Sequence, residues 1–183
     1  MIIKTERLTL RPFKESDALD LYEYLKEPLV HCFMCMKIDS VEAAKREITN
    51  RINDEFYFAI ELNENHKVIG EISGHIESAD PEQKDYDTVS PCWMLNKLYQ
   101  RKGYMHEAVK AYFNYLFNDI GVRRIYIYTE DYNVSCQKLC EKLGVRKEGE
   151  FKEFVSFVKD SNGKPIYENT WQYAILSNEW NKK

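Results

Sequence analysis

Apolar residues recur along the chain with two periods, and each change of period predicts a new element. Residues 7–11 alternate, with Leu8 and Leu10 on one side and polar residues on the other, which is typical of a strand. Spacings of three or four predict helices after Ser16, after Asp39, and over 105–120 and 135–144. Alternating or β-rich runs predict further strands at 55–62, 68–77, 88–96, 123–131, 145–158 and 166–176.

The predicted helices have recognisable ends. Asp39 followed by Glu42 has the pattern of a capping box, and Gly121 and Gly144 follow the last turns of the two later helices. The order is β-α-α-β-β-β-α-β-α-β-β, without a repeat or linker. It predicts one α/β (α+β) domain over residues 1–183. We expect a mixed, mostly antiparallel sheet, one parallel crossover and about four flanking helices.

Composition and charge narrow the functional class. The 183 residues include 26 Lys and Arg against 30 Asp and Glu, a net charge of -4, which argues against a nucleic-acid partner. No apolar run approaches the roughly 20 residues that span a membrane, and MIIKTERL lacks the apolar centre of a signal peptide. Five cysteines are an odd set that suits reduced thiols. We therefore expect a cytoplasmic protein without a membrane partner.

The most informative segment joins the predicted strand 88–96 to the 105–120 helix. A helix N-terminus offers unpaired backbone N–H groups and the positive end of a dipole, which together bind phosphate. Gly103 permits a close backbone approach, and Arg101 and Lys102 add positive charge. The segment predicts a pyrophosphate site, although one glycine by itself is more typical of an ordinary strand-to-helix turn with a solvated basic pair. Its candidate residues are Gln100, Arg101, Lys102, Gly103, Tyr104, Met105 and His106.

Residues Gln100 to Met105 resemble the Q/R-x-x-G-x-G/A signature of the GNAT superfamily of N-acetyltransferases, which binds the pyrophosphate of acetyl-CoA. Further blocks are similar to its RimJ/RimL branch: Thr5 to Pro12, Gly103-Tyr104 with Glu107-Ala108, Asn133, Glu141 to Gly144, Glu148-Gly149 and Glu179-Trp180. Each block is short, but their order and spacing cover nearly the whole chain. That branch acetylates ribosomal-protein N-termini and many small amines.

The resemblance implies a fold, a cosubstrate and contacts to it. A GNAT-like domain has two neighbouring parallel strands that splay apart, here near Leu95 and Thr129. The pantetheine arm of acetyl-CoA would pair with the backbone of Met94, Leu95 and Asn96. The Leu95 N–H would also stabilise the oxyanion, which is worth about 3 kcal/mol. Asn133 resembles the family asparagine that binds the cofactor, and it suits a helix N-cap equally well.

The chain departs from the family pattern at three positions. Met105 stands where the signature has Gly or Ala, and we expect its side chain to point into the core. Cys140 replaces the tyrosine that protonates the departing thiolate in many members, and Cys136 falls where the RimL-like pattern has a serine. A thiol has a suitable pKa for that proton transfer. The alternative, that both cysteines are small core residues, is left open.

Two pairs of cysteines raise the question of a metal site. Cys32 and Cys35 form a C-x-x-C, and Cys136 and Cys140 lie one helical turn apart, so four thiolates are available for zinc. The first pair has no turn-forming residue between its cysteines, and the resembled family needs no metal. We therefore expect these thiols to pack in apolar surroundings and predict no metal.

A general base for the acceptor amine is expected on the strand 68–77. Glu71, Ser73, His75 and Glu77 share one face by alternation. Glu71 or His75 would act through water if this face borders the cleft, with Glu77 or Asp87 holding a cation. The alternative is an exposed polar sheet face. Acidic residues of the 79–87 loop, namely Asp80, Glu82, Asp85 and Asp87, would attract a cationic acceptor.

Together these observations predict an acetyl-CoA-dependent N-acetyltransferase that acts by direct attack of a primary amine. We expect the amine to be a peptide or protein N-terminus of the ribosomal-protein kind. Residues 28–38 and the last hairpin would wall the acceptor side, with Phe33, Met36, Phe154 and Phe157. Two alternatives remain: a small amine such as a polyamine or antibiotic, and a non-catalytic acyl-CoA sensor in which Cys140 marks the lost acid. A homodimer is also left open.

Overall fold

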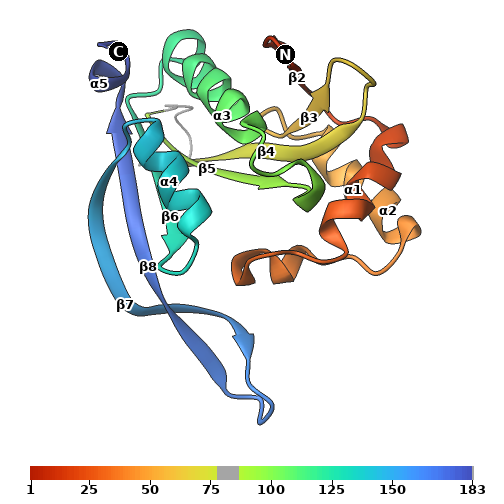
Figure 1. Ribbon diagram of the computed structural model, residues 1–183, viewed down its shortest axis with the longest axis vertical. Helices are drawn as coiled ribbons and strands as arrows, with labels where there is room; N and C mark the ends of the chain where they lie inside the picture. The colour runs from red at the N-terminus through yellow and green to blue at the C-terminus, as the bar shows by residue number, and fades with distance from the viewer. Residues whose placement is uncertain (78–86, 183) are drawn as a thin grey trace.

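The computed structural model describes residues 1–77 and 87–182, which form one eight-stranded sheet with helices on both faces (Figure 1). The strands are β1 (Ile3–Lys4), β2 (Leu8–Arg11), β3 (Phe58–Leu62), β4 (Val68–Glu77), β5 (Thr88–Leu95), β6 (Arg124–Glu130), β7 (Arg146–Lys159) and β8 (Pro165–Leu176). The helices are α1 (Ala18–Leu25), α2 (Val41–Ile52), α3 (Tyr104–Asn114), α4 (Val134–Lys142) and α5 (Ser177–Trp180). The predicted order of elements is confirmed from β2 to β8, and the structure adds the short strand β1 before it and the helix α5 after it.

The sheet runs in the order β1-β2-β3-β4-β5-β6-β8-β7, and its neighbours are antiparallel except for β5 and β6. These two parallel strands pair at Thr88 with Arg124 and at Val89 with Ile125. Beyond Val89, β5 stays with β4 as far as Leu95, while β6 stays with β8 as far as Glu130. The sheet therefore splits between β5 and β6, as the family resemblance implies.

Two hydrophobic cores cover opposite faces of this sheet. Alternation along β3 directs Phe58 and Ile60 into a core with α3 and α4, and directs Ala59 into a second core with α1 and α2. Tyr112 and Phe113 of α3 are fully buried in the first core. Both faces are thus covered, and the split between β5 and β6 opens between the two layers (Figure 1).

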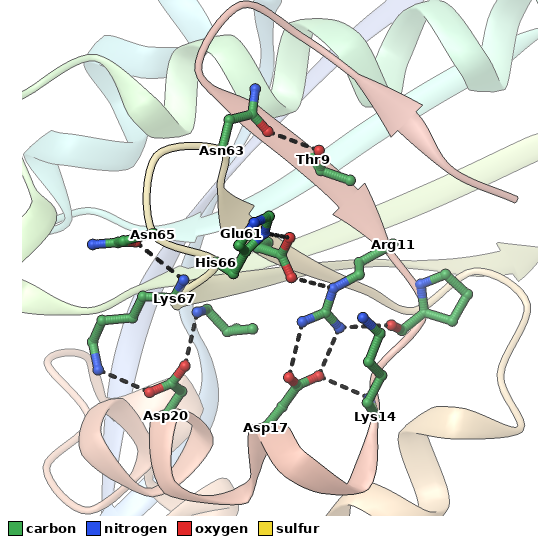
Figure 2. A network of polar contacts seen from close by, with 12 residues as sticks. Thr9, Arg11, Lys14, Asp17, Asp20, Glu61, Asn63, Asn65, His66 and Lys67 are labelled. Atoms are coloured by element: carbon green, nitrogen blue, oxygen red, sulfur yellow. Dashed lines mark hydrogen bonds and ion pairs between the residues drawn. The ribbon is translucent and has the colours of Figure 1, made fainter.

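Arg11 fixes the N-terminal half of the sheet to the turn that precedes α1 (Figure 2). Its guanidinium is buried and donates to both carboxylate oxygens of Asp17, at 2.7 and 2.9 Å, and through Nε to Glu61. On the same side, Lys67 Nζ donates to Asp20 at 2.8 Å. Breaking such a buried pair costs about 3–5 kcal/mol because one charge is left without its partner.

Three details differ from the sequence prediction. The second helix is capped by Ser40, whose Oγ accepts from the Ala43 N–H at 3.1 Å, so Asp39 is the wrong capping residue. The expected 105–120 helix is α-helical to Asn114 and then π-helical to Ile120, where Gly121 ends it with φ 85°. The irregular segment 28–38 contains a 3-10 helix at His31–Met36. Within the described residues, no helix is long and apolar enough to cross a membrane.

Candidate active site

A cavity of about 800 Å³ opens where β5 and β6 separate. One end is lined by the first turn of α3 and by α4, with Met105 and Cys136, which pack against the first core. The other end is lined by α1 and the 3-10 helix, with Tyr24, Phe33 and Met36, which belong to the second core. Because the two cores lie on opposite faces, the cavity passes through the split in the sheet.

The end of β5 presents one backbone N–H to this cavity. The Asn96 N–H donates to the Ile69 carbonyl at 2.8 Å, so in an antiparallel ladder the N–H of the preceding residue, Leu95, points away from β4 and toward the split. Met94 and Leu95 line the cavity. Asn96 does not, because its buried side chain caps a 3-10 turn by accepting from the Leu98 N–H at 3.0 Å. The Asn96 N–H, which was predicted to pair with the pantetheine arm, is therefore already bonded to the Ile69 carbonyl.

The predicted phosphate loop forms the N-terminus of α3. Gly103 is the N-cap residue with φ 85°, and Arg101 has φ 63°, so the loop turns through two left-handed residues. Gln100, Arg101, Tyr104 and Met105 line the cavity. Lys102 and Gly103 do not line it, and the side chain of His106 lies in a separate hollow with Lys110 and Lys142. Burial and these two lysines lower the pKa of His106.

A set of charged contacts joins the loop to the first strands. Glu107, in the first turn of α3, accepts from the Arg7 N–H at 2.8 Å, from Arg7 Nε at 2.7 Å and from the Thr5 hydroxyl at 2.6 Å. Arg7 also donates to the Lys102 carbonyl at 3.0 Å and covers the Tyr104 ring. In the sequence, Thr5 and Arg7 lie in one block and Glu107 lies in another. In the fold, these three residues form one hydrogen-bonded cluster that holds the loop, and we call this cluster the latch.

Helix α4 brings one of its two cysteines to the cavity. Asn133 caps α4 by accepting from the Cys136 N–H at 3.2 Å, and both residues line the cavity. Cys140 is fully buried in the first core and does not. The neighbouring Cys140 lowers the pKa of Cys136, whereas the contact with Cys136 and burial raise the pKa of Cys140. Of the two predicted proton donors, Cys136 therefore has access to a reacting group.

Cysteines from distant segments meet at the cavity. Cys32 and Cys92 line it together with Cys136. Cys92 is accessible inside the cavity but enclosed by protein, and this burial raises its pKa to about 12. Cys35 instead donates to the Cys32 carbonyl within the 3-10 helix. No group of three or more His, Cys, Asp or Glu side chains suited to a metal occurs in residues 1–77 and 87–182.

The predicted bases on β4 lie away from the cavity wall. Glu71 is buried and accepts from Tyr24 and Tyr57, each at 2.8 Å, and from Arg51 at 3.1 and 3.2 Å. Its carboxylate is therefore part of an ion pair. His75 is exposed and, like Glu71, is absent from the cavity lining. Glu77 accepts from the Tyr126 hydroxyl, Asp87 pairs with Arg123, and Asp80, Glu82 and Asp85 lie outside the described residues.

Only one of the two segments expected to line the acceptor side does so. Phe33 and Met36 line the cavity, as expected of the 28–38 segment. Phe154 and Phe157 do not, because they are exposed on the hairpin of β7 and β8, which extends away from the rest of the molecule (Figure 1).

Comparison with known proteins gives this architecture a family. Residues 7–146 match the family model described as an acetyltransferase (GNAT) domain. The chain belongs to the GNAT family. A Bacillus subtilis protein, the uncharacterized N-acetyltransferase YnaD, is 29% identical over 99% of this chain and 100% of its own length.

Solved structures of GNAT proteins have the same fold. The GNAT-family acetyltransferase from Bacillus anthracis superposes with a TM-score of 0.83 at 26% identity, covering 98% of this chain and 100% of that one. The ribosomal-protein-S5-alanine acetyltransferase from Vibrio fischeri does so with a TM-score of 0.73 at 23% identity, covering 98% of each. This GNAT protein is an N-acetyltransferase, and its fold implies acetyl-CoA as the cosubstrate.

The charges around the cavity fit that cosubstrate. The GNAT cavity is lined at the α3 and α4 end by Arg101, Lys138 and Lys142, which suit the phosphates of a CoA ester, whereas Lys97 also lines the cavity but pairs with Glu27 of the α1 end. Leu95 directs its N–H into the split, where a pantetheine arm can pair with it. The residues present therefore fit acetyl-CoA at this end and leave the α1 end for a second substrate.

Proposed function

We propose that this protein transfers the acetyl group of acetyl-CoA directly to the primary amine of a peptide or protein N-terminus. The observation that carries the proposal is the cavity that passes through the split sheet. A cosubstrate held at the basic α3 and α4 end and an acceptor entering beneath α1 meet at the split without a covalent acyl-enzyme. Bringing the two reactants together in one cavity is itself a large part of such catalysis.

Three groups of the chain have assigned roles in this proposal. The Leu95 N–H stabilises the negative charge that develops on the thioester oxygen. Asn133 orders the N-terminus of α4 beside the cosubstrate, and the Cys136 thiol supplies the proton for the departing thiolate. When bound, acetyl-CoA supplies an acyl group activated toward amines.

The preference for a peptide acceptor rests on the family resemblance and on the residues that line the α1 end. Val30, Cys32, Phe33 and Met36 line it from the 3-10 segment, Glu23 and Tyr24 line it from α1, and Glu27 follows two residues after α1. A cavity of about 800 Å³ has room for more than the cosubstrate's reactive end, which suits the first residues of a peptide. A small amine such as a polyamine or an antibiotic remains the alternative, because its positive charge would also be attracted by the acidic residues Glu23 and Glu27 that line this end.

The test is acetylation of a short basic peptide, followed by the release of CoA thiol. We expect turnover with a free N-terminus and none after that N-terminus is blocked, with the lysine side chains kept unchanged. Equal activity on the blocked peptide or on spermidine would assign the enzyme to another acceptor. Binding of acetyl-CoA without turnover over the whole panel would favour the acyl-CoA sensor.

A further inference from the structure

Among residues 1–77 and 87–182, the buried carboxylates are, with one exception, each paired with a cationic or basic side chain. Asp17 and Glu61 share Arg11, as Figure 2 shows, Glu71 binds Arg51, and Glu168 binds His31. Glu130 is 3% exposed, and none of the ion pairs of the described residues includes it. A buried charge without a partner costs free energy, so Glu130 is a site where a cationic ligand would be stabilised.

Glu130 is the last residue of β6 and borders the cavity at the split. Its side-chain oxygens accept from the Cys32 N–H at 3.3 Å and from Asn133 Nδ2 at 3.4 Å. Burial raises the pKa of the Cys32 thiol, and the neighbouring Glu130 carboxylate raises it further. These partners are neutral and the two hydrogen bonds are long. They hold the carboxylate in place and leave its charge uncompensated.

Neighbouring hydroxyl groups independently indicate that a ligand completes this site. Thr129 precedes Glu130, lines the same cavity and is 3% exposed, and its hydroxyl has no hydrogen-bond partner among the described residues. Thr170 lies opposite Glu130 on β8, and its buried hydroxyl also lacks a partner within the described part of the chain. Buried polar groups are nearly always bonded in a folded protein. By alternation Thr170 shares a face with Glu130, whereas Thr129 points to the other face of β6, so the unbonded hydroxyl beside the uncompensated carboxylate is that of Thr170. This buried pair is expected to meet a polar ligand.

We propose that Glu130 binds the ammonium group of the acceptor and takes its proton. The proposal rests on the proposed function and deepens it, because it names a catalytic residue and makes the acceptor a cationic primary amine. Cys92, Tyr24, Phe33 and Tyr128 line the same cavity as Glu130, so the ammonium enters surroundings where a carboxylate attracts it more strongly than in water.

The proton and electron balance of the step is simple. The ammonium gives one proton to the Glu130 carboxylate, and the resulting amine nitrogen uses its lone pair to form a bond with the thioester carbon. The carbon–sulfur bond breaks, and the sulfur takes its electron pair. The Cys136 thiol gives its proton to that sulfur, the second nitrogen proton restores the Cys136 thiol, and Glu130 returns the first proton to solvent.

Activity measurements test the catalytic assignment. Glu130→Gln keeps the shape of the side chain and removes its charge and basicity. With spermidine and with a basic peptide that has a free N-terminus, we expect the variant to lose about 10²–10⁴ in kcat. With hydroxylamine, which is neutral at pH 7 and needs no base to become nucleophilic, we expect a loss of less than about tenfold. Glu64→Gln removes the same charge from an exposed turn and serves as the control.

A uniform loss on all three acceptors, or no loss on any, would overturn the role of Glu130. If the wild-type enzyme acetylates none of the three acceptors, the proposed function fails. The Tm of the variants then shows whether Glu130 lacks a cationic partner in the folded protein. Without ligand, Glu130→Gln should leave the Tm unchanged or raise it, because no ion pair is lost and the glutamine oxygen can still accept the hydrogen bond from Cys32. Glu71→Gln, which breaks the pair with Arg51, should lower the Tm by several degrees. A similar drop in both variants would show that Glu130 already has a partner, and would overturn the proposal.

Discussion

Gly103 has a conformation that side chains rarely adopt, at the position where α3 begins. Its φ is 85°, and a Cβ added there would lie 3.3 Å from an Arg7 guanidinium nitrogen. A substitution would strain the backbone and press on the latch that holds the loop. Both effects act on the group of backbone N–H atoms that we expect to receive the pyrophosphate.

We expect Gly103→Val to remove binding of acetyl-CoA while the protein stays folded. The measurement is the shift in Tm that acetyl-CoA produces. Gly163→Val is the matched control, since Gly163 has φ 80° in the distant β7–β8 turn and nothing lies within 4 Å of its added Cβ. Both variants carry the same backbone strain, so full affinity in Gly103→Val would refute a phosphate role for this loop.

Replacing Cys136 is expected to affect catalysis, whereas replacing Cys140 is expected to affect stability. If Cys136 protonates the thiolate, Cys136→Ala should lose about 10²–10⁴ in kcat with little change in KM for acetyl-CoA. Cys140→Ala should instead lower the free energy of unfolding by about 1 kcal/mol, because it removes a buried sulfur from the core. Steady-state kinetics and urea unfolding separate the two effects. Equal activity in both variants would leave packing as the role of both cysteines.

At the scale of elements, the start of α3 is fixed by contacts from outside its own helix. The polypeptide before β2 supplies Thr5 and Arg7, and the first turn of α3 supplies Glu107. Burial alone would raise the pKa of Glu107, but hydrogen bonds from Thr5 and Arg7 outweigh it and lower that pKa below its usual value. The carboxylate form is therefore the one that holds the loop.

This latch should weaken in acid. Because the pKa of Glu107 is lower in the folded than in the unfolded protein, its contribution is present above the unfolded pKa and is lost as pH falls through the folded pKa. Glu107→Gln should cost about 1–2 kcal/mol at neutral pH, given that Arg7 is partly exposed, and progressively less as the pH falls through the folded pKa of Glu107. Urea unfolding over a series of pH values measures this difference. A constant difference would exclude the carboxylate as its source.

The split between β5 and β6 organises the whole molecule, because it joins two layers that the sheet otherwise separates. Ligand binding at the split should therefore stabilise the protein globally. At a concentration of acetyl-CoA one hundred times its dissociation constant, mass action predicts about 2.7 kcal/mol of added stability. Calorimetric unfolding with acetyl-CoA and with desulfo-CoA measures it. Absence of any shift would contradict binding of the cosubstrate in this cavity.

Sequence periodicity determined most of the elements, since alternating and helical patterns reflect which faces are buried. It also predicted the end of the long helix at Gly121, because a left-handed residue is required there. The N-cap of α2 was predicted one residue too early. Asp39 and Ser40 are both residue types that cap helices, and only the backbone conformation in the fold shows that Ser40 is the capping residue. The parallel crossover was predicted from the order of elements, and the loop before α3 from Gly103 and two basic residues at a helix start. The separation of β5 from β6 followed from the family resemblance.

Only the tertiary structure decided which polar side chains are available for chemistry. Glu71 and Glu130 are both glutamates on β-strands, and nothing local distinguishes them. Arg51 reaches Glu71 from α2, whereas none of the basic side chains that the structure describes forms an ion pair with Glu130. The same holds for the latch of Arg7 on Glu107, whose members lie 100 residues apart. A sequence determines which faces are buried through short-range periodicity, but the partner of each buried charge depends on long-range contacts that the fold alone creates.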